Sequence, residues 1–164
     1  MELQLIDICN NRNSVKFLKR CSQMDARFIV IGGAALCYHG IREPGSIKDL
    51  DIYIEPEMEN VKKLMHVFQY IGVELVTDPI KMCQIDMKIS IINEEFQIDI
   101  LSPKENEVFD ELYERSLTFD MLYPGIRIAH TSDIIKMKER AVSITKQRLD
   151  VHAKDLRALK SDFS

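Results

Sequence analysis

The segment from Phe28 to Asp51, FIVIGGAALCYHGIREPGSIKDLD, decides the fold of this chain. It opens with a short apolar run that stops at two glycines, which indicates a buried strand followed by a tight turn. Ala34 to His39 then suits a helix that ends at Gly40. Leu50 to Ile54 alternates between apolar and polar residues and indicates a second strand. A strand, a helix and a strand in this order favour an α/β fold.

Two aspartates, Asp49 and Asp51, form a D-x-D pair at the start of the second predicted strand. Residues two apart in a strand point to the same face, so the two carboxylates project side by side. Adjacent carboxylates repel each other unless a cation neutralises them, and Mg²⁺ is a hard cation that suits oxygen ligands. The pair therefore indicates a metal site, although the same pattern also arises by chance on solvated strand faces.

A third carboxylate, Asp99, lies on the polar face of a strand predicted from Phe96 to Leu101. This strand forms a hairpin with Met87 to Ile92 around the polar loop Asn93 to Glu95. If the hairpin lies beside the strand that carries Asp51, Asp99 joins the cluster. Three carboxylates can hold two Mg²⁺ ions for a phosphoryl or nucleotidyl transfer. The alternative is that Asp99 is an ordinary exposed strand residue.

Gly32 and Gly33 lie between a predicted strand and a predicted helix, where backbone N–H groups can approach phosphate oxygens. The pattern is not the G-x-G-x-x-G dinucleotide fingerprint, and it is not a P-loop, which requires G-K-[ST]. Taken alone, the two glycines are better explained by a tight turn from strand to helix.

The order of these motifs resembles the nucleotidyltransferase superfamily of the polymerase β-like kind, in particular the minimal bacterial nucleotidyltransferases and the AbiEii kind of type IV toxin. The usual pattern of that family is G-G-x-A-x-x-x-H-G-x-x-R-x-T-x-D-x-D. The residues that fit it are Gly32, Gly33, Ala35, His39, Gly40, Asp49 and Asp51. Arg42 lies one place early, Ser46 stands in for the threonine, and the loop from 43 to 47 is about two residues longer.

The similarity continues into the C-terminal region. Relatives have a helix of the type D-L-I-x-x-K, followed by an arginine and a K-D-x-x-x-L segment. Asp133 to Lys138 matches the first pattern, with Lys138 at the lysine position, and Arg148 and Lys154 to Leu156 match the rest. The similarity thus covers roughly residues 28 to 159.

The resemblance implies a nucleotidyltransferase fold of the α/β (α+β) class, with a small mixed sheet flanked by helices. It implies a single domain over residues 1–164. Within this domain we expect N-terminal helices over 1–24, a catalytic core over 27–101 and C-terminal helices over 131–160.

The resemblance also implies an enzyme that depends on Mg²⁺, or on Mn²⁺, and moves a nucleoside monophosphate from an NTP such as ATP to an acceptor hydroxyl. Relatives use tRNA and other RNA, proteins or small molecules as acceptors. By the resemblance, Asp49 and Asp51 bind the metal and the triphosphate, and Asp99 joins the metal site and helps to activate the acceptor. The residues implied in nucleotide binding are Gly32, Gly33, Ser46, Lys48 and Lys138.

Two other functions stay open. The fold also persists in catalytically inactive binding modules and in toxin–antitoxin components. The chain is near the minimal size for the fold, so a homodimer or a cognate protein partner would complete the acceptor pocket. A plain nucleic-acid-binding module would instead use the basic segment from Lys136 to Lys160. Its binding would weaken steeply with salt and would not depend on Asp49 or Asp51.

Composition excludes several other classes. Hydrophobic residues make up 46% of the chain and charged residues 29%, which is typical of a globular protein. The net charge of −4 argues against nucleic-acid binding by the chain as a whole. No run approaches the roughly 20 apolar residues of a membrane helix, and Met1 to Gln4 does not begin a signal peptide, so we expect a cytoplasmic protein without membrane contact. No C-x-x-C spacing occurs, which predicts reduced thiols at Cys9, Cys21, Cys37 and Cys83.

The rest of the chain predicts mainly helices. They are expected over Leu3 to Cys9, after a cap at Ser14, over Pro56 to Ile71, over Glu105 to Arg115 and over 133–159. The last region has Thr131 or Ser132 as its cap and a break near Arg148. Tyr123 to Gly125 predicts a turn.

Overall fold

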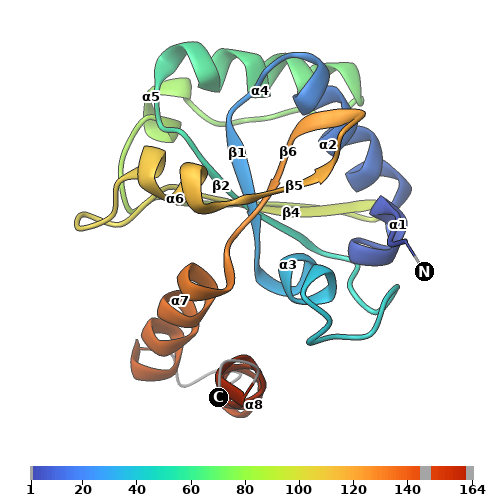
Figure 1. The fold of residues 1–164 in the computed structure, drawn as a ribbon. Coiled ribbons are helices and arrows are strands. Elements are labelled where there is room, and N and C mark those ends of the chain that lie inside the picture. Colours follow the sequence, from blue (N-terminus) through green and yellow to red (C-terminus); the bar gives the residue numbers. More distant parts are fainter. Residues whose placement is uncertain (1, 145–148, 162–164) are drawn as a thin grey trace.

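The computed structural model describes residues 2–144 and 149–161 of the chain. Within these residues, the strands are β1 (Phe28–Ile31), β2 (Leu50–Ile54), β3 (Lys88–Asn93), β4 (Phe96–Leu101), β5 (Leu117–Asp120) and β6 (Tyr123–Ile128). They form one sheet in the order β3-β4-β2-β1-β6-β5, with helices around it (Figure 1). The predicted fold class, a small mixed sheet flanked by helices, is confirmed.

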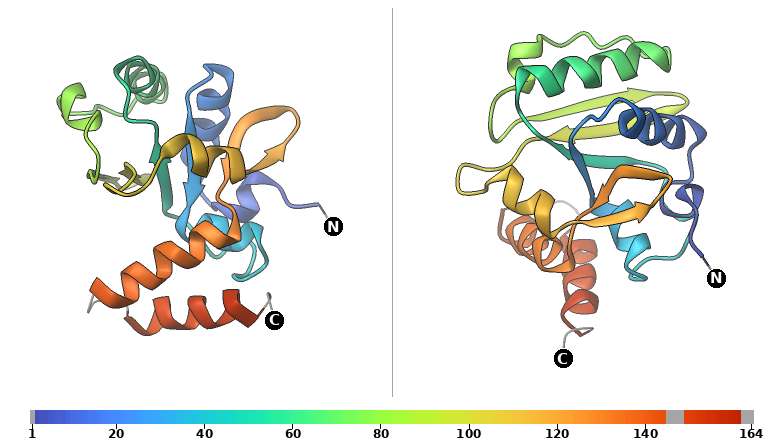
Figure 2. Two further views of the ribbon diagram at one scale, coloured as in Figure 1. Left: turned by 60° about the vertical axis from the view of Figure 1, so that its left-hand side comes forward. Right: turned by 45° about the horizontal axis from the view of Figure 1, so that its top comes forward.

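The described helices include two short ones and two that pair at the C-terminal end. They are α1 (Leu5–Ile8), α2 (Arg12–Gln23), α3 (Gly32–Tyr38), α4 (Met58–Tyr70), α5 (Pro79–Met82), α6 (Phe109–Arg115), α7 (Thr131–Ile144) and α8 (Leu149–Ser161). All views show α7 and α8 side by side at the end of the molecule where β1 runs into α3 (Figures 1 and 2). No helix among the described residues is long and apolar enough to cross a membrane.

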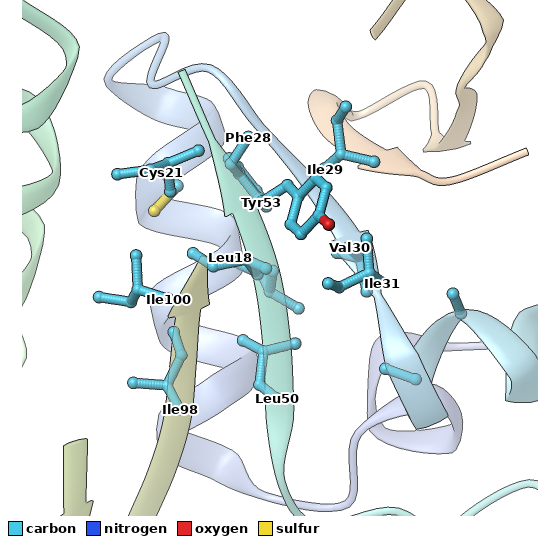
Figure 3. Close-up of a cluster of buried hydrophobic side chains, with 14 of the residues drawn as sticks. Leu18, Cys21, Phe28, Ile29, Val30, Ile31, Leu50, Tyr53, Ile98 and Ile100 are labelled. Carbon is cyan, nitrogen blue, oxygen red and sulfur yellow. The ribbon is translucent and has the colours of Figure 1, made fainter. Parts of the chain in front are cut away.

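The central strands combine parallel and antiparallel pairing. β1 lies between β2, to which it is antiparallel, and β6, to which it is parallel. β2 is parallel to β4, while β3 and β5 pair antiparallel with β4 and β6 at the two edges. Successive side chains of each strand point to opposite faces. Figure 3 shows the result, since Tyr53 of β2 projects away from Leu18 and Cys21 of α2.

One face of the sheet carries the aromatic part of the core, and α2 and α4 cover it. The rings of Phe17, Phe68 and Phe96 are buried, with centroids 4.9 to 6.4 Å apart. Such contacts add to the free energy of burying the rings. Because the side-chain period of a strand is two residues, a slip of one position would turn this apolar face outward. The core therefore sets which residues remain on the opposite face.

The N-cap of α2 is Asn11, and the predicted cap at Ser14 is wrong. The side-chain oxygen of Asn11 accepts the backbone N–H groups of Asn13 at 2.9 Å and Ser14 at 3.2 Å. Asparagine and serine cap helices equally well, so composition alone does not separate them. The Asn11 amide also donates to the carbonyl of Glu95 at 2.8 Å, a tertiary bond that favours this start.

The predicted turn over Tyr123–Gly125 is also wrong, because these residues begin β6. The turn lies two residues earlier, where the Asp120 carboxylate accepts the N–H of Leu122 at 2.8 Å. Gly125 donates its N–H to the Ser22 hydroxyl of α2 at 3.0 Å instead of to a neighbouring strand. A Cβ at Gly125 would lie 3.0 Å from the Cα of Ser22, so glycine here permits the close approach of α2. Packing against α2 thus overrides the local turn composition.

The start of α7 differs slightly from the prediction. Ser132 donates its backbone N–H to the His130 ring at 3.1 Å, so His130 takes the capping role expected of Thr131 or Ser132. The short helix α5, which Asp78 caps, was not predicted. The predicted break near Arg148 lies outside the described residues.

Asn60 joins α4 to the two central strands. Its buried side chain accepts the N–H of Arg27 at 2.7 Å and donates to the carbonyls of Arg27 at 2.9 Å and Glu55 at 3.0 Å. Arg27 directly precedes β1 and Glu55 directly follows β2. One amide therefore bonds three backbone groups at the ends of β1 and β2, where the Arg27 carbonyl also accepts the N–H of Glu55.

We expect Asn60→Ala to lower the free energy of unfolding by about 2–4 kcal/mol, because buried backbone groups lose their partners. Urea denaturation measures the change. Lys62→Ala, at an exposed position of the same helix, is the matched control and should change stability by less than about 0.5 kcal/mol. Equal stability of Asn60→Ala and the wild type would contradict the structural role of this side chain.

Candidate active site

The register of the sheet places Asp51 and Asp99 next to each other. β2 and β4 run parallel, and Asp51 is the direct partner of Asp99 in their ladder. Both side chains therefore project from the same face, the one turned away from α2 and α4. The prediction that the hairpin strand lies beside the strand of Asp51 is confirmed, and so is the common face of these two carboxylates.

Burial and repulsion raise the pKa of Asp51 to about 7. The largest cause is the loss of water around the carboxyl group, followed by the charge of Asp99 and a hydrogen bond with its carboxyl. Asp49 adds a smaller rise, and the charge of Lys88 opposes it. Like charges this close disfavour a doubly ionised pair, so a proton or a cation is needed between them. The two carboxylates fit a divalent metal ion, which would replace the proton.

Asp49 lies at the edge of this pair. It precedes β2, its side chain is exposed, and it is close enough to Asp51 to raise the pKa of that carboxyl. Among residues 2–144 and 149–161, no group of three or more His, Cys, Asp or Glu side chains could hold a metal ion. Mg²⁺ commonly takes one or two carboxylates and completes its shell with water and substrate phosphates. The structure brings Asp51 and Asp99 side by side. The role of Asp49 in metal binding stays a prediction.

Gly32 makes room for the Asp51 carboxylate. It follows β1 with a φ of +63°, a left-handed conformation that glycine adopts readily. A Cβ at this position would collide with Oδ2 of Asp51. At Gly33, a Cβ would lie 2.7 Å from Cδ1 of Ile47. Close packing therefore explains why both positions of this turn are glycine. This explanation does not depend on whether their N–H groups bind phosphate.

We expect Gly32→Ala to lower the free energy of unfolding by more than about 2 kcal/mol, because it combines backbone strain with a clash against Asp51. Gly72→Ala is the control, since Gly72 has a φ of +79° but open space where the Cβ would lie. The control should lose only about 1 kcal/mol, from strain alone. Chemical denaturation compares the two variants, and equal losses would show that the contact with Asp51 carries no weight.

The loop between α3 and β2 carries Ser46 and Lys48, both exposed. The Ser46 hydroxyl donates to the carbonyl of Glu43 at 2.6 Å and closes the loop on itself. Two buried thiols hold the loop from the core side, Cys37 through the Glu43 carbonyl at 3.4 Å and Cys9 through the Lys48 carbonyl at 3.6 Å. Burial raises the pKa of both thiols, that of Cys9 to about 11, so both remain protonated donors.

All four cysteines are free thiols, as the sequence predicted. Cys37 lies in α3 and Cys9 directly follows α1, and neither forms a disulfide bond. The loop geometry before Asp49 therefore depends on hydrogen bonds rather than on a covalent bridge.

Lys138 lies where α7 packs on α8. Its ammonium group is 3.1 Å from the Asp155 carboxylate and 3.1 Å from Nδ1 of His152. Arg42 donates two N–H groups to the same carboxylate, at 2.7 and 3.3 Å. Burial acts to raise the pKa of Asp155, but the bonds from Arg42 and Lys138 hold it below its ordinary value. Asp155 thus joins α7, α8 and the loop after α3, and it is the partner of both cations.

Lys88 is a neighbour of the carboxyl pair that the sequence did not single out. Its Nζ lies 4.0 Å from Oδ2 of Asp99, and its side chain is 61% exposed. Ser90, on the same face of β3, is the direct ladder partner of Asp99. The alternation of β3 was visible in the sequence, but the register that brings Lys88 to Asp99 was not.

The motif His39-Gly40 has a structural role here. His39 Nε2 is 2.8 Å from the carbonyl of Ala129, which links the end of α3 to the segment between β6 and α7. Burial is the main cause that lowers the pKa of His39. A neutral ring at this point is consistent with a bond that holds two segments together.

A scan against protein-family models finds no match for this chain, and a search of the curated proteins finds none either. The nucleotidyltransferase resemblance therefore stays a prediction from the motifs. The placement of Asp51, Asp99 and Gly32 around one point of the sheet is independent of it.

The raised pKa of Asp51 predicts how the stability of the metal-free protein depends on pH. In an unfolded chain an aspartate has a pKa of about 3.9, whereas in the folded protein that of Asp51 is about 7. Between these values the folded state holds a proton that the unfolded state has lost. This part of the free energy of unfolding is therefore present at low pH and is lost as the pH rises toward about 7.

We expect Asp51→Asn to remove this loss, because asparagine does not ionise. In a chelating buffer at about pH 8, the variant should melt several degrees above the wild type, and the difference should shrink toward about pH 4. Thermal unfolding across this pH range measures it, with Glu114→Gln, at an exposed acid on α6, as the control. A parallel pH profile for Asp51→Asn and the wild type would contradict the raised pKa.

Proposed function

We propose that this protein is a metal-dependent nucleotidyltransferase, which moves a nucleoside monophosphate from an NTP to an acceptor hydroxyl. The observation that carries the proposal is the pair of Asp51 and Asp99 packed against the Gly32 turn. Two carboxylates in this position favour a divalent cation, and a cation held there attracts a triphosphate. The order of the motifs around the pair agrees with the same activity.

Asp51 and Asp99 would hold Mg²⁺, with Mn²⁺ as the other suitable ion. When bound, the ion would supply stabilisation of the charge that develops on the α-phosphate and on the leaving pyrophosphate. Asp49, exposed beside the pair, would extend the acidic site toward the triphosphate. Asp99 would orient the acceptor hydroxyl and take its proton.

The reaction forms a bond between the acceptor oxygen and the α-phosphorus, and it breaks the bond from that phosphorus to the oxygen that leaves with pyrophosphate. Ser46 and Lys48 lie exposed on the loop that leads into Asp49, and they would contact phosphate oxygens from there. The N–H groups of Gly32 and Gly33 would serve the same phosphates. Lys138 is bound to Asp155, so we assign it the positioning of α7 rather than direct nucleotide contact.

Thermal unfolding with each NTP, with and without Mg²⁺, tests this function. Ligand at about 100 times its dissociation constant adds roughly 2.7 kcal/mol, which raises the melting temperature of a chain of this size by about 5–10 °C. We expect a rise that requires both NTP and Mg²⁺. Asp51→Asn and Asp99→Asn should lose it, whereas Glu114→Gln should retain it.

Pyrophosphate release in the presence of candidate acceptors then measures the reaction itself. Removal of either carboxylate should lower the rate by about 100-fold or more, because each acts on the charge of the transition state. A thermal rise that survives Asp51→Asn would place the nucleotide elsewhere. No rise with any NTP would contradict the proposal and favour a non-catalytic module, such as a toxin–antitoxin component that binds a partner protein.

A further inference from the structure

Helix α2 carries four cations on one face. Arg12, Lys16, Lys19 and Arg20 follow the spacing i, i+4, i+7 and i+8, which places them along one side of a helix. We call this set the α2 basic stripe. The opposite side of α2 is buried in the core. The helix contains no acidic residue, although the whole chain has a net charge of −4.

Helix stability does not explain the stripe. Arg12 is the first residue of α2 and Lys16 follows one turn later, near the positive end of the helix dipole, where cations are unfavourable. No ion pair between described residues involves any of the four cations. Like charges grouped without acidic partners repel one another, so the stripe is suited to an anion from outside the chain.

Two tyrosines and a hollow border the stripe. The Arg20 guanidinium carbon lies 4.4 Å from the centre of the Tyr70 ring, and Lys19 Nζ lies 5.4 Å from that of Tyr123. Tyr70 is 65% exposed. A hollow of about 360 Å³ opens between α2 and the end of α4, and Lys16, Lys19, Arg20 and Tyr70 line it. No acidic residue is among its lining residues.

We propose that the α2 basic stripe binds single-stranded nucleic acid. Cations along a helix face are about 6 Å apart at the i, i+4 spacing, which lets them contact successive backbone phosphates. An exposed aromatic ring beside such a row provides a surface for base stacking, and this combination is typical of proteins that bind single strands. An acidic peptide would bind the cations, but it carries no nucleobase that could stack on the Tyr70 ring or fill the hollow.

Four acids line hollows that adjoin the stripe. Glu2 and Asp120 share a separate hollow with Lys19, and Glu94 and Glu95 share another with Asn13. None of these four acids lines the hollow that Tyr70 shares with the stripe, so the strand would follow Lys16 and Arg20 along that hollow.

The segment just before α2 contacts the loop that precedes Asp49. Asn10, just before α2, donates its backbone N–H to the carbonyl of Ile47, and Cys9 donates to the carbonyl of Lys48. The Arg12 end of the stripe is therefore the end nearer the candidate active site. Binding at α2 needs neither NTP nor the carboxylates, so this proposal does not rest on the transferase function.

Fluorescence anisotropy with a labelled single-stranded RNA of about 20 nucleotides, and with DNA of the same sequence, tests the stripe. We expect Lys16→Ala/Lys19→Ala to weaken binding at least tenfold. Lys62→Ala/Lys81→Ala removes the same charge from exposed positions elsewhere and should change the affinity less than twofold. Alanine is a better helix former than lysine, and a melting curve of each variant checks that the fold is kept.

Salt dependence separates phosphate contacts from stacking. On single strands each neutralised phosphate contributes about −0.7 to the slope of log affinity against log salt, so the double lysine variant should have a slope shallower by about 1.4. Tyr70→Ala should weaken binding by roughly fivefold or more with the slope unchanged, because stacking releases no counterions. The RNA and DNA arms show whether the ribose hydroxyl adds to a surface built for phosphates and bases.

Three outcomes would overturn the proposal. They are no binding of either strand by the wild type at low salt, equal losses in the stripe variant and the control, and displacement of the strand by polyglutamate at matched charge. Asp51→Asn should bind the strand as the wild type does. That result keeps the stripe and the carboxylate site experimentally separate, because a failure of nucleotide binding would leave strand binding intact.

Discussion

The parallel pairing of β2 with β4 is the constraint on which the rest of this structure depends. It turns Ile52 and Ile100 toward α2 and α4, and the same register leaves Asp51 and Asp99 side by side on the other face. A slip of β4 by one residue would turn Asp99 into the apolar core and separate it from Asp51. Core packing therefore holds together two like charges that would separate if they were free to do so.

The surroundings of the carboxyl pair follow from that constraint. Gly32 leaves space for Asp51, and buried thiols and Asp155 hold the loop after α3 through hydrogen bonds and ion pairs. The pair itself works against stability when both groups are ionised, which is common where a protein binds a cation. The cations of α2 do not oppose stability in this way, because they lie along the side of the helix that faces away from the core.

The parts of the fold that follow from local periodicity were predictable. Short windows of sequence are enough to recognise the strands β2 and β4, the helix α4 and the D-x-D pair. The hairpin of β5 and β6 was not predictable, because Pro124 and Gly125 are residues typical of turns. In the structure both lie in β6, where Gly125 contacts α2. Lys138 matched a motif for nucleotide contact, yet its partner Asp155 comes from another helix and no local pattern reveals it.

The sequence by itself determined which residues share a face, because the two-residue period of a strand and the 3.6-residue period of a helix are local properties. It thus predicted a common face for Asp49 and Asp51 and put Asp99 on the polar face of its strand, and the spacing of the α2 cations is equally local. Only the tertiary structure decided that Asp99 lies beside Asp51, that Lys88 joins them, and that Tyr70 borders the cations of α2. These contacts join segments far apart in the chain, and their partners are chosen by the packing of the whole core rather than by any neighbouring residue.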